Sequence, residues 1–281
     1  MHPLTKEKKV ARVSEEAKRR YNEKIQEYRS TVDEMLAREK SVLGKIDEED
    51  PETPYKRLTL ADEALNMVSY YLLMNELSLT LLGIKNESFL NEARKSVYKS
   101  IIYMEEVVSD YVDVPFSEYE ERLEKIENFD ERSKWNLLSK LGFSIDSVRE
   151  AFGENSKWRW SFIELHARFA VVAKNFLDLK NFLQNMEPRL PGYRMRMEHM
   201  NMVKEMLEQA ANNYRQKYEL TTSRMDDFKA AINYLGSLRR IHILLGGSEQ
   251  SDVIKKKMDV WKSKMEADSK NAELAKKKER K

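Results

Sequence analysis

Histidine and methionine are the side chains that could give this sequence a soft-metal site, because it contains no cysteine. The four histidines lack the usual spacings. Neither Glu-x-x-His, which puts two ligands on one inner helix face of a di-iron bundle, nor His-Glu-x-x-His occurs. His166 stands near Glu164, but no serine or cysteine nucleophile motif accompanies it. We therefore interpret the histidines as packing or surface residues.

Methionines gather in one stretch around His199, and we call this group the methionine strip. Its members are Met195, Met197, Met200, Met202 and Met206. Thioethers are soft donors, so a copper(I) site is one interpretation of the strip. The alternative is irregular packing or an adaptable contact surface, for which proteins often use methionine. We favour a contact surface and expect no metal.

Phosphate binding has no recognisable motif in this chain. It has only eight glycines, and they form neither Gly-x-Gly-x-x-Gly nor the P-loop pattern. An enzyme without these motifs would have to use carboxylates that no spacing singles out. We therefore expect a protein that is not an enzyme and that binds no cofactor.

Charge is unevenly distributed, although the net charge is only +2. The acidic segment, residues 105–131, holds eleven Asp or Glu against Arg122 and Lys125. From Arg189 onward basic residues outnumber acidic ones, with lysines concentrated in 255–257 and 276–281. Complementary patches steer association. One interpretation is head-to-tail contact between copies, which can propagate into filaments; the other is ordinary solvated faces and a disordered tail.

Nucleic acid or another anionic surface is the rival partner of the basic C-terminal segment. No helix-turn-helix or other reader is recognisable, and no aromatic residue beyond Trp261 interleaves with the lysines. Nucleic acid is therefore the less favoured partner. A protein partner or self-association is the interpretation we prefer.

Composition predicts that all these residues lie on long helices. Charged residues make up 35% of the chain, and Gly plus Pro account for only 14 positions, which favours helices with few turns. No alternating run of Val, Ile and Thr indicates a strand. We predict an all-α fold, an elongated multi-helix bundle with a long N-terminal helical arm.

The predicted arm covers residues 1–50, with one helix from Thr5 to about Glu48. Apolar residues from Val10 to Ile46 recur at steps of three and four, as in a coiled coil. Such a narrow row packs either on one other helix of this chain or on another molecule. We call its central part the N-terminal seam and predict that it forms an interaction surface. The seam consists of Tyr21, Ile25, Tyr28 and Val32.

An acidic, proline-containing linker over residues 51–58 is expected to precede a core domain of residues 59–247. The domain opens with a helix from Thr59 to Gly83, with Thr59 and Asp62 as a capping box. This helix is apolar almost all round, so we expect other helices to surround it. Glu76 in its middle disfavours a transmembrane span.

The rest of the core domain is expected to contain long helices joined by shorter ones. The predicted long helices begin near Asn86, Ser156, Gly192 and Ser223. The predicted short helices span Ser117–Glu127, Asp130–Gly142 and Ser144–Gly153, with glycine ending the last two. A C-terminal helix from Ser251 and a basic tail complete the chain, as a unit of residues 248–281.

The plan of the chain resembles the all-helical flagellar-coiling (sheath) proteins of spirochaetes. The features concerned are residues 10–46, the Thr59–Gly83 helix and the methionine strip, and no functional residue is carried over. The resemblance implies a periplasmic subunit that coats a filament such as a flagellum. The stretch Met1–Lys6 lacks the apolar core of a signal peptide. The expected location is therefore the cytoplasm if this N-terminus is native, and the periplasm if it is a processed one.

The function we expect is structural. The chain would bind itself or a protein partner through helix faces, above all through the N-terminal seam and the methionine strip. The alternative is an adaptor that binds nucleic acid or an anionic surface through the basic C-terminal segment.

Overall fold

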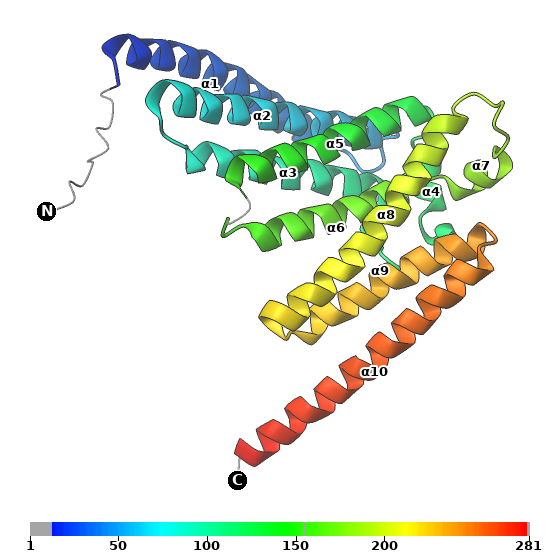
Figure 1. Ribbon diagram of the computed structural model, residues 1–281. Coiled ribbons are helices and arrows are strands. Elements are labelled where there is room, and N and C mark those ends of the chain that lie inside the picture. Colours follow the sequence, from blue (N-terminus) through cyan, green and yellow to red (C-terminus); the bar gives the residue numbers. More distant parts are fainter. Residues whose placement is uncertain (1–12, 154–155, 280–281) are drawn as a thin grey trace, which may run out of the picture.

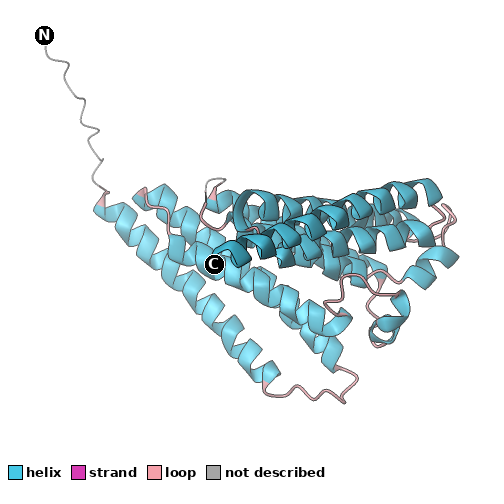
Figure 2. Cartoon of the chain, turned by 90° about the horizontal axis from the view of Figure 1, so that it is seen from below, coloured by secondary structure: helices cyan, strands magenta, loops and turns pink. Residues whose placement is uncertain are grey.

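The computed structural model describes residues 13–153 and 156–279, and over these residues the chain is all-α, as predicted. Ten α-helices follow one another without a strand in the described part (Figure 2). Their bounds are α1 (Glu15–Leu43), α2 (Thr53–Leu82), α3 (Glu87–Val108), α4 (Glu120–Glu124), α5 (Glu131–Phe152), α6 (Arg159–Asn175), α7 (Leu179–Gln184), α8 (Tyr193–Lys217), α9 (Met225–Leu244) and α10 (Ser248–Glu279). A 3-10 turn (Phe116–Glu118) and a π turn (Tyr218–Thr222) complete them.

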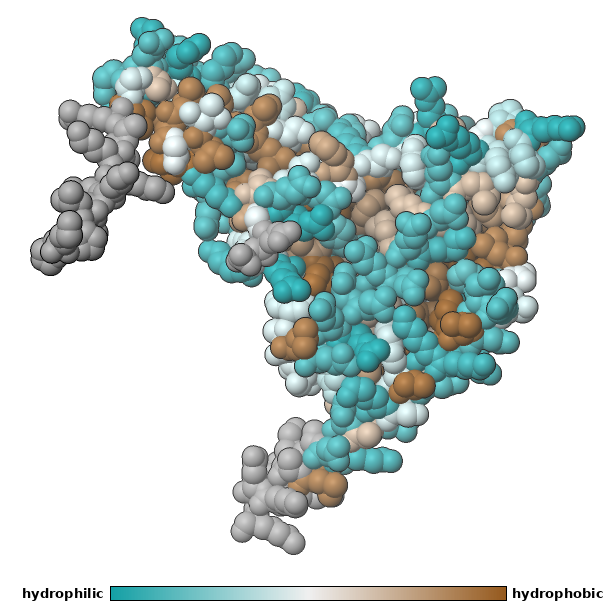
Figure 3. Space-filling model, viewed as in Figure 1, coloured by the Kyte–Doolittle hydropathy of each residue, from teal (hydrophilic) through white to brown (hydrophobic). Residues whose placement is uncertain are grey.

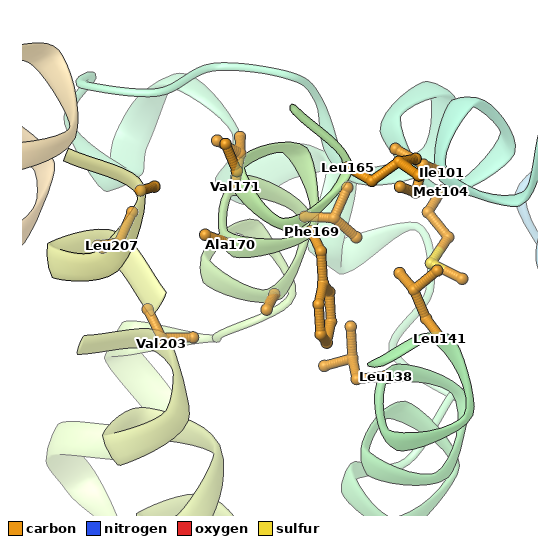
Figure 4. Packing of buried hydrophobic residues seen from close by; sticks show 14 of the residues in the cluster. Ile101, Met104, Leu138, Leu141, Leu165, Phe169, Ala170, Val171, Val203 and Leu207 are labelled. Atoms are coloured by element: carbon orange, nitrogen blue, oxygen red, sulfur yellow. The ribbon is translucent and has the colours of Figure 1, made fainter. Parts of the chain in front are cut away.

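The helices form two groups joined by α6. One group contains α1, α2, α3 and α5, and α8, α9 and α10 cross below it in Figure 1. Figure 4 shows α6 between α3, α5 and α8, with its buried side chains pointing to both groups. Leu165 and Phe169 face α3 and α5, while Ala170 and Val171 lie on the side of α8. One continuous hydrophobic core therefore connects the two groups.

The N-terminal helix is shorter than predicted. Ser14 accepts a hydrogen bond from the backbone N–H of Ala17 (3.1 Å), so α1 begins at Glu15, and it ends before Gly44. The predicted start at Thr5 and the first apolar position, Val10, lie outside the described residues. With 29 residues the helix is about 43 Å long, and it packs along α2.

The linker expected at residues 51–58 contains the first turns of α2, because that helix begins at Thr53. Pro54 suits the first turn of a helix, where its missing N–H leaves no bond unmade. Thr59 lies inside the helix and donates its hydroxyl hydrogen to the carbonyl of Tyr55 (3.0 Å), so the predicted capping box was wrong. The predicted end was right, since Gly83 adopts a left-handed conformation (φ 68°).

The expectation that neighbours surround α2 holds only for its first half. In the second half Leu73 and Leu79 keep 46% and 47% of their surface exposed, and Ile84 beyond the helix keeps 60%. Figure 3 shows hydrophobic side chains gathered at this end of the molecule. The helix is apolar all round in sequence, but the fold supplies partners for only part of its circumference.

Two predicted helix ends were wrong for tertiary reasons. Gly142 does not end a helix: it lies within α5, where an added Cβ would sit 3.0 Å from Cε1 of Phe169. The glycine is thus used for the close approach of α6. Conversely, the helix predicted from Ser156 breaks after α6, and Asp178 caps α7 by accepting a hydrogen bond from the N–H of Asn181 (2.9 Å).

The predicted helix starts at Ser117 and Ser223, each with an acidic residue three positions later, also differ from the structure. Ser117 lies in the 3-10 turn, and α4 begins at Glu120 without a side-chain cap. Ser223 adopts a left-handed conformation (φ 49°) after the π turn, and α9 begins without a side-chain cap. A serine followed three residues later by an acidic residue was therefore not a sufficient signal for a helix start in this chain.

Candidate functional site

The N-terminal seam lies against α2 of the same chain. Ile25 and Val32 are 6% and 3% exposed and belong to a small core that includes Met67 and Met74 of α2. The Tyr28 ring lies 5.9 Å from the ring of Tyr70. The hydroxyl of Tyr21 accepts a hydrogen bond from Ser78 Oγ (3.2 Å). In this conformation the seam holds α1 to α2, and only its half-buried tyrosines are open to a partner.

A buried ionic contact reinforces this packing. Glu39 of α1 is 6% exposed and accepts hydrogen bonds from Lys99 Nζ (2.8 Å) and from the hydroxyl of Tyr103, both on α3. Burial, together with the Glu39 carboxylate, raises the pKa of Tyr103 above its usual range, so the hydroxyl remains a donor. The acceptor on α1 thus has two fixed donors on α3, which ties the N-terminal helix to the body.

The methionine strip lies on α8 and is mostly a packing element. Met200 is fully buried, while Met197, Met202 and Met206 are half-buried against the main core. Met195 lines a cavity at the start of the helix. The strip as a contact surface stays a prediction, and it can apply only to its half-buried members.

His199, within the strip, is held as a neutral side chain. Burial lowers the pKa of this histidine to about 4, and its Nε2 lies 2.8 Å from the carbonyl oxygen of Ala173, which requires a proton on that nitrogen. Over the described residues, no three His, Asp or Glu side chains are placed to hold a metal ion. His199 has the partner and the protonation state of a structural residue.

The cavity at the start of α8 has a volume of about 720 Å³ and also borders α5 and α7. Trp135, Phe182 and Met195 form part of its wall. Lys134 also lines it, and burial lowers the pKa of this lysine although Asp178 and Glu131 oppose the effect. The only histidine in the wall is His199, whose Nε2 is already bonded, so no base–nucleophile pair is assembled there from described residues.

The acidic segment divides into two sets. Five of its carboxylates form ion pairs with basic residues elsewhere in the chain. These pairs are Glu105–Arg168, Glu106–Arg57, Asp113–Arg240, Glu120–Lys180 and Glu131–Arg196. The other six are exposed and have no ion-pair partner among the described residues: Asp110, Glu118, Glu121, Glu124, Glu127 and Asp130. About half of the charge excess that the sequence displays therefore serves the fold.

Lys174 is a buried lysine that no sequence pattern singles out. It is 3% exposed, and its Nζ lies 4.7 Å from the centre of the Tyr119 ring. No carboxylate of the described residues lies within ion-pair distance of it. Burial, with Arg240 adding to the effect and Asp113 opposing it, lowers the pKa of Lys174 to about 7. The neighbouring Asn175 donates from Nδ2 to the carbonyl of Ser109 (2.9 Å), a residue with a positive φ of 90°.

The C-terminal helix α10 presents two distinct faces. Ile254 and Trp261 are 8% and 2% exposed and face the rest of the body. Beside this face, one residue earlier in each heptad, an outer row repeats every seven residues: Val253, Val260, Ala267 and Leu274. All four are exposed, with 61%, 67% and 57% for the two valines and the leucine. Figure 3 shows isolated hydrophobic side chains on the otherwise hydrophilic surface of this part.

Sequence reasoning did not single out the outer row, because Val253 and Ile254 are adjacent and only the fold shows which of them faces inward. The signal is the spacing of seven, which can be recognised once Trp261 and Ile254 are known to face inward. Of the N-terminal seam, the methionine strip and the outer row, only the outer row has no cover within the described chain.

A family model gives the relationship of the chain to known proteins. The model of the TP0443 family matches residues 17–269, which run from α1 into α10. The chain belongs to the TP0443 family. This Treponema-type family agrees with the spirochaetal part of the resemblance and carries no indication of flagellar coiling. No curated protein and no solved structure matches the chain.

This member of the TP0443 family has no candidate membrane span in its described helices. Within residues 13–153 and 156–279, each helix is either too short or too polar to cross a bilayer.

Proposed function

We propose that the protein is a non-enzymatic structural subunit that assembles with itself or with a protein partner through the outer face of α10. The observation that carries the proposal is the exposed outer row. Isolated exposed apolar residues are common on protein surfaces, but these four recur on one helix at steps of seven residues, about 10.5 Å apart, and so form a regular row. Coating of a filament such as a flagellum, which the resemblance implies, is the more specific form of the same proposal.

The placement of the other candidate surfaces supports the choice of α10. The N-terminal seam is engaged by α2, and Met200 of the methionine strip is in the core. The outer row, in contrast, is exposed, and Figure 1 shows α10 at the edge of the molecule. A helix that packs by one face and exposes an apolar stripe on another is suited to a helix–helix contact.

Light scattering of the purified protein over a range of concentrations tests the proposal. We expect a mass that rises with concentration, and a monomer when Val253→Glu and Val260→Glu are combined. These changes put charges into an apolar contact without disturbing the buried face. The matched control is Phe143→Glu, at a residue of α5 that is 75% exposed. A mass that stays monomeric at every concentration would contradict self-association.

The alternative function is binding of nucleic acid or an anionic surface by the basic C-terminal segment. It is favoured by exposed lysines of α10 that have no ion-pair partner among the described residues: Lys255, Lys256, Lys262 and Lys270. Gel shifts with DNA or RNA and sedimentation with anionic vesicles at low salt test it. Binding that disappears when Asn271–Lys281 is deleted would support the alternative, and no binding at low salt would exclude it.

A further inference from the structure

The edges of the outer row on α10 carry opposite charges. Asp252, Asp259 and Glu266 follow one edge at intervals of seven residues, and Lys257 and Lys264 follow the other. The three acidic residues are exposed and have no ion-pair partner among the described residues, whereas Lys257 pairs with Glu208 of α8 (3.5 Å) and Lys264 with Asp268 of α10 (3.3 Å). When the outer row is taken as position a of a heptad, the acidic edge is position g and the basic edge is position e.

From this arrangement, and resting on the proposed function, we infer that the occupant of the outer row is the α10 helix of a second copy, packed parallel and in register. In a parallel pair position g of one helix faces position e of the next heptad of the other. Asp252 then meets Lys257 of the second copy, which exchanges its contact with Glu208, and Asp259 meets Lys264 of the second copy, which exchanges its contact with Asp268. An antiparallel pair would instead bring the acidic edges together and the basic edges together. Charge complementarity therefore selects the parallel orientation.

The geometry of α10 leaves room for this contact along the helix. Its inward face, with Ile254 and Trp261, packs against the body, and the outer row lies about 100° round the helix from that face, so the partner would approach beside the body. The helix has 32 residues and is about 48 Å long, so the outer row extends over three heptad intervals. Because the same surface is used by both copies, the contact is isologous and closes as a two-fold dimer.

Two lysines limit the strength of the pair. Lys256 and Lys270 occupy position d, with Ser263 between them, where a strong coiled coil has leucine. Their long side chains can place the ammonium groups in water, but the lysines of the two copies still bring like charges near each other. The inferred dimer is therefore weak. Replacing both lysines by leucine is expected to lower the dissociation constant by at least roughly tenfold.

Cysteine cross-linking provides the test, because the protein has no cysteine of its own. Val253→Cys and Leu274→Cys are made as separate variants in the full chain and oxidised mildly. In a parallel in-register pair equivalent a positions lie close enough for a disulfide, so each variant is expected to cross-link to itself. In an antiparallel pair neither would do so, and only a mixture of the two would cross-link. Lys262→Cys, on another face of α10, is the control for random collision.

The outcomes separate this inference from the proposed function. Self-linking of both variants, well above the Lys262→Cys control, together with tighter association of the leucine double variant, supports the parallel pair. Three outcomes overturn the parallel pair but leave assembly in place. These are a mass that rises with concentration without self-linking, cross-linking only in the mixture of the two variants, and linking no greater than that of the Lys262→Cys control. A protein that is monomeric throughout overturns both the pair and the self-association form of the proposed function.

Discussion

Lys174 is the residue at which this fold most strongly perturbs ordinary side-chain chemistry. Its ammonium group lies under the Tyr119 ring, and Asp113, the acidic group that acts on it, is engaged in an ion pair with Arg240 (3.0 Å). The local arrangement also requires Gly236, where an added Cβ would lie 2.3 Å from Oδ2 of Asp113. Lysine is therefore held in a place that favours its neutral form.

The stability of the protein should consequently depend on pH between about 7 and 9.5. The folded pKa of Lys174 is about 7 and its ordinary value is 10.5, so in this window unfolding takes up a proton. The free energy of unfolding is expected to rise with pH by up to about 1.4 kcal/mol per pH unit from this group. Below pH 7 the lysine is charged in both states and the contribution no longer changes.

Replacing the buried charge tests this. Lys174→Met is expected to unfold at higher urea concentration than the parent at pH 7 and to lose the rise between pH 7 and 9.5, because a side chain of similar length fills the site without a charge. Urea titrations at several pH values measure both effects. Lys180→Met, at an exposed position, should retain the parent's pH dependence. An equal slope in Lys174→Met and in the parent would show that another group is responsible.

At the scale of elements, the docking of α1 on α2 has the clearest consequence. Ile25 contributes a buried side chain and Glu39 a buried acceptor to the same interface. Neither helix alone covers its apolar face, so the two are expected to be stable only together. The buried hydrogen bonds to Lys99 and Tyr103 add a geometric requirement that apolar packing lacks.

Ile25→Asp is therefore expected to lower the free energy of unfolding by roughly 3–5 kcal/mol, since it removes apolar contacts and buries a carboxylate. Denaturation in urea, followed by circular dichroism, measures the change. Asn22→Asp, on the exposed side of α1, should be nearly neutral. A fully stable Ile25→Asp monomer that had lost assembly would instead mean that the seam contacts another molecule.

At the scale of the whole molecule, α6 makes the two helix groups one cooperative unit. Its side chains reach α3, α5 and α8, and the hydrophobic core is continuous across them (Figure 4). Separate domains would show separate cores joined by few contacts. The chain is thus expected to unfold in one step.

Calorimetry tests this expectation. We expect a single thermal transition in which the calorimetric and van't Hoff enthalpies of unfolding agree, because the described core unfolds as one unit. Scans at low concentration avoid a contribution from self-association. Two resolved transitions would indicate that α8, α9 and α10 unfold independently of the N-terminal helices.

Sequence by itself determined the fold class, most of the long helices and the apolar spacing of the N-terminal seam. These follow from local physics, because helix periodicity, caps such as Asn86 and Asp130, and the left-handed Gly83 act within a few residues. The same reasoning failed at Gly142, since a glycine used for close packing looks the same as one that ends a helix.

Tertiary structure alone decided which of the recognisable faces are covered. The N-terminal seam and the outer row of α10 have similar patterns, yet one is buried by α2 and the other is exposed. The tertiary structure also pairs five carboxylates of the acidic segment with basic residues and leaves the other six exposed. It likewise places Lys174 in the core. The reason is physical: a helix's sequence fixes the direction of its apolar side chains, but whether anything lies in that direction depends on residues far away in the chain.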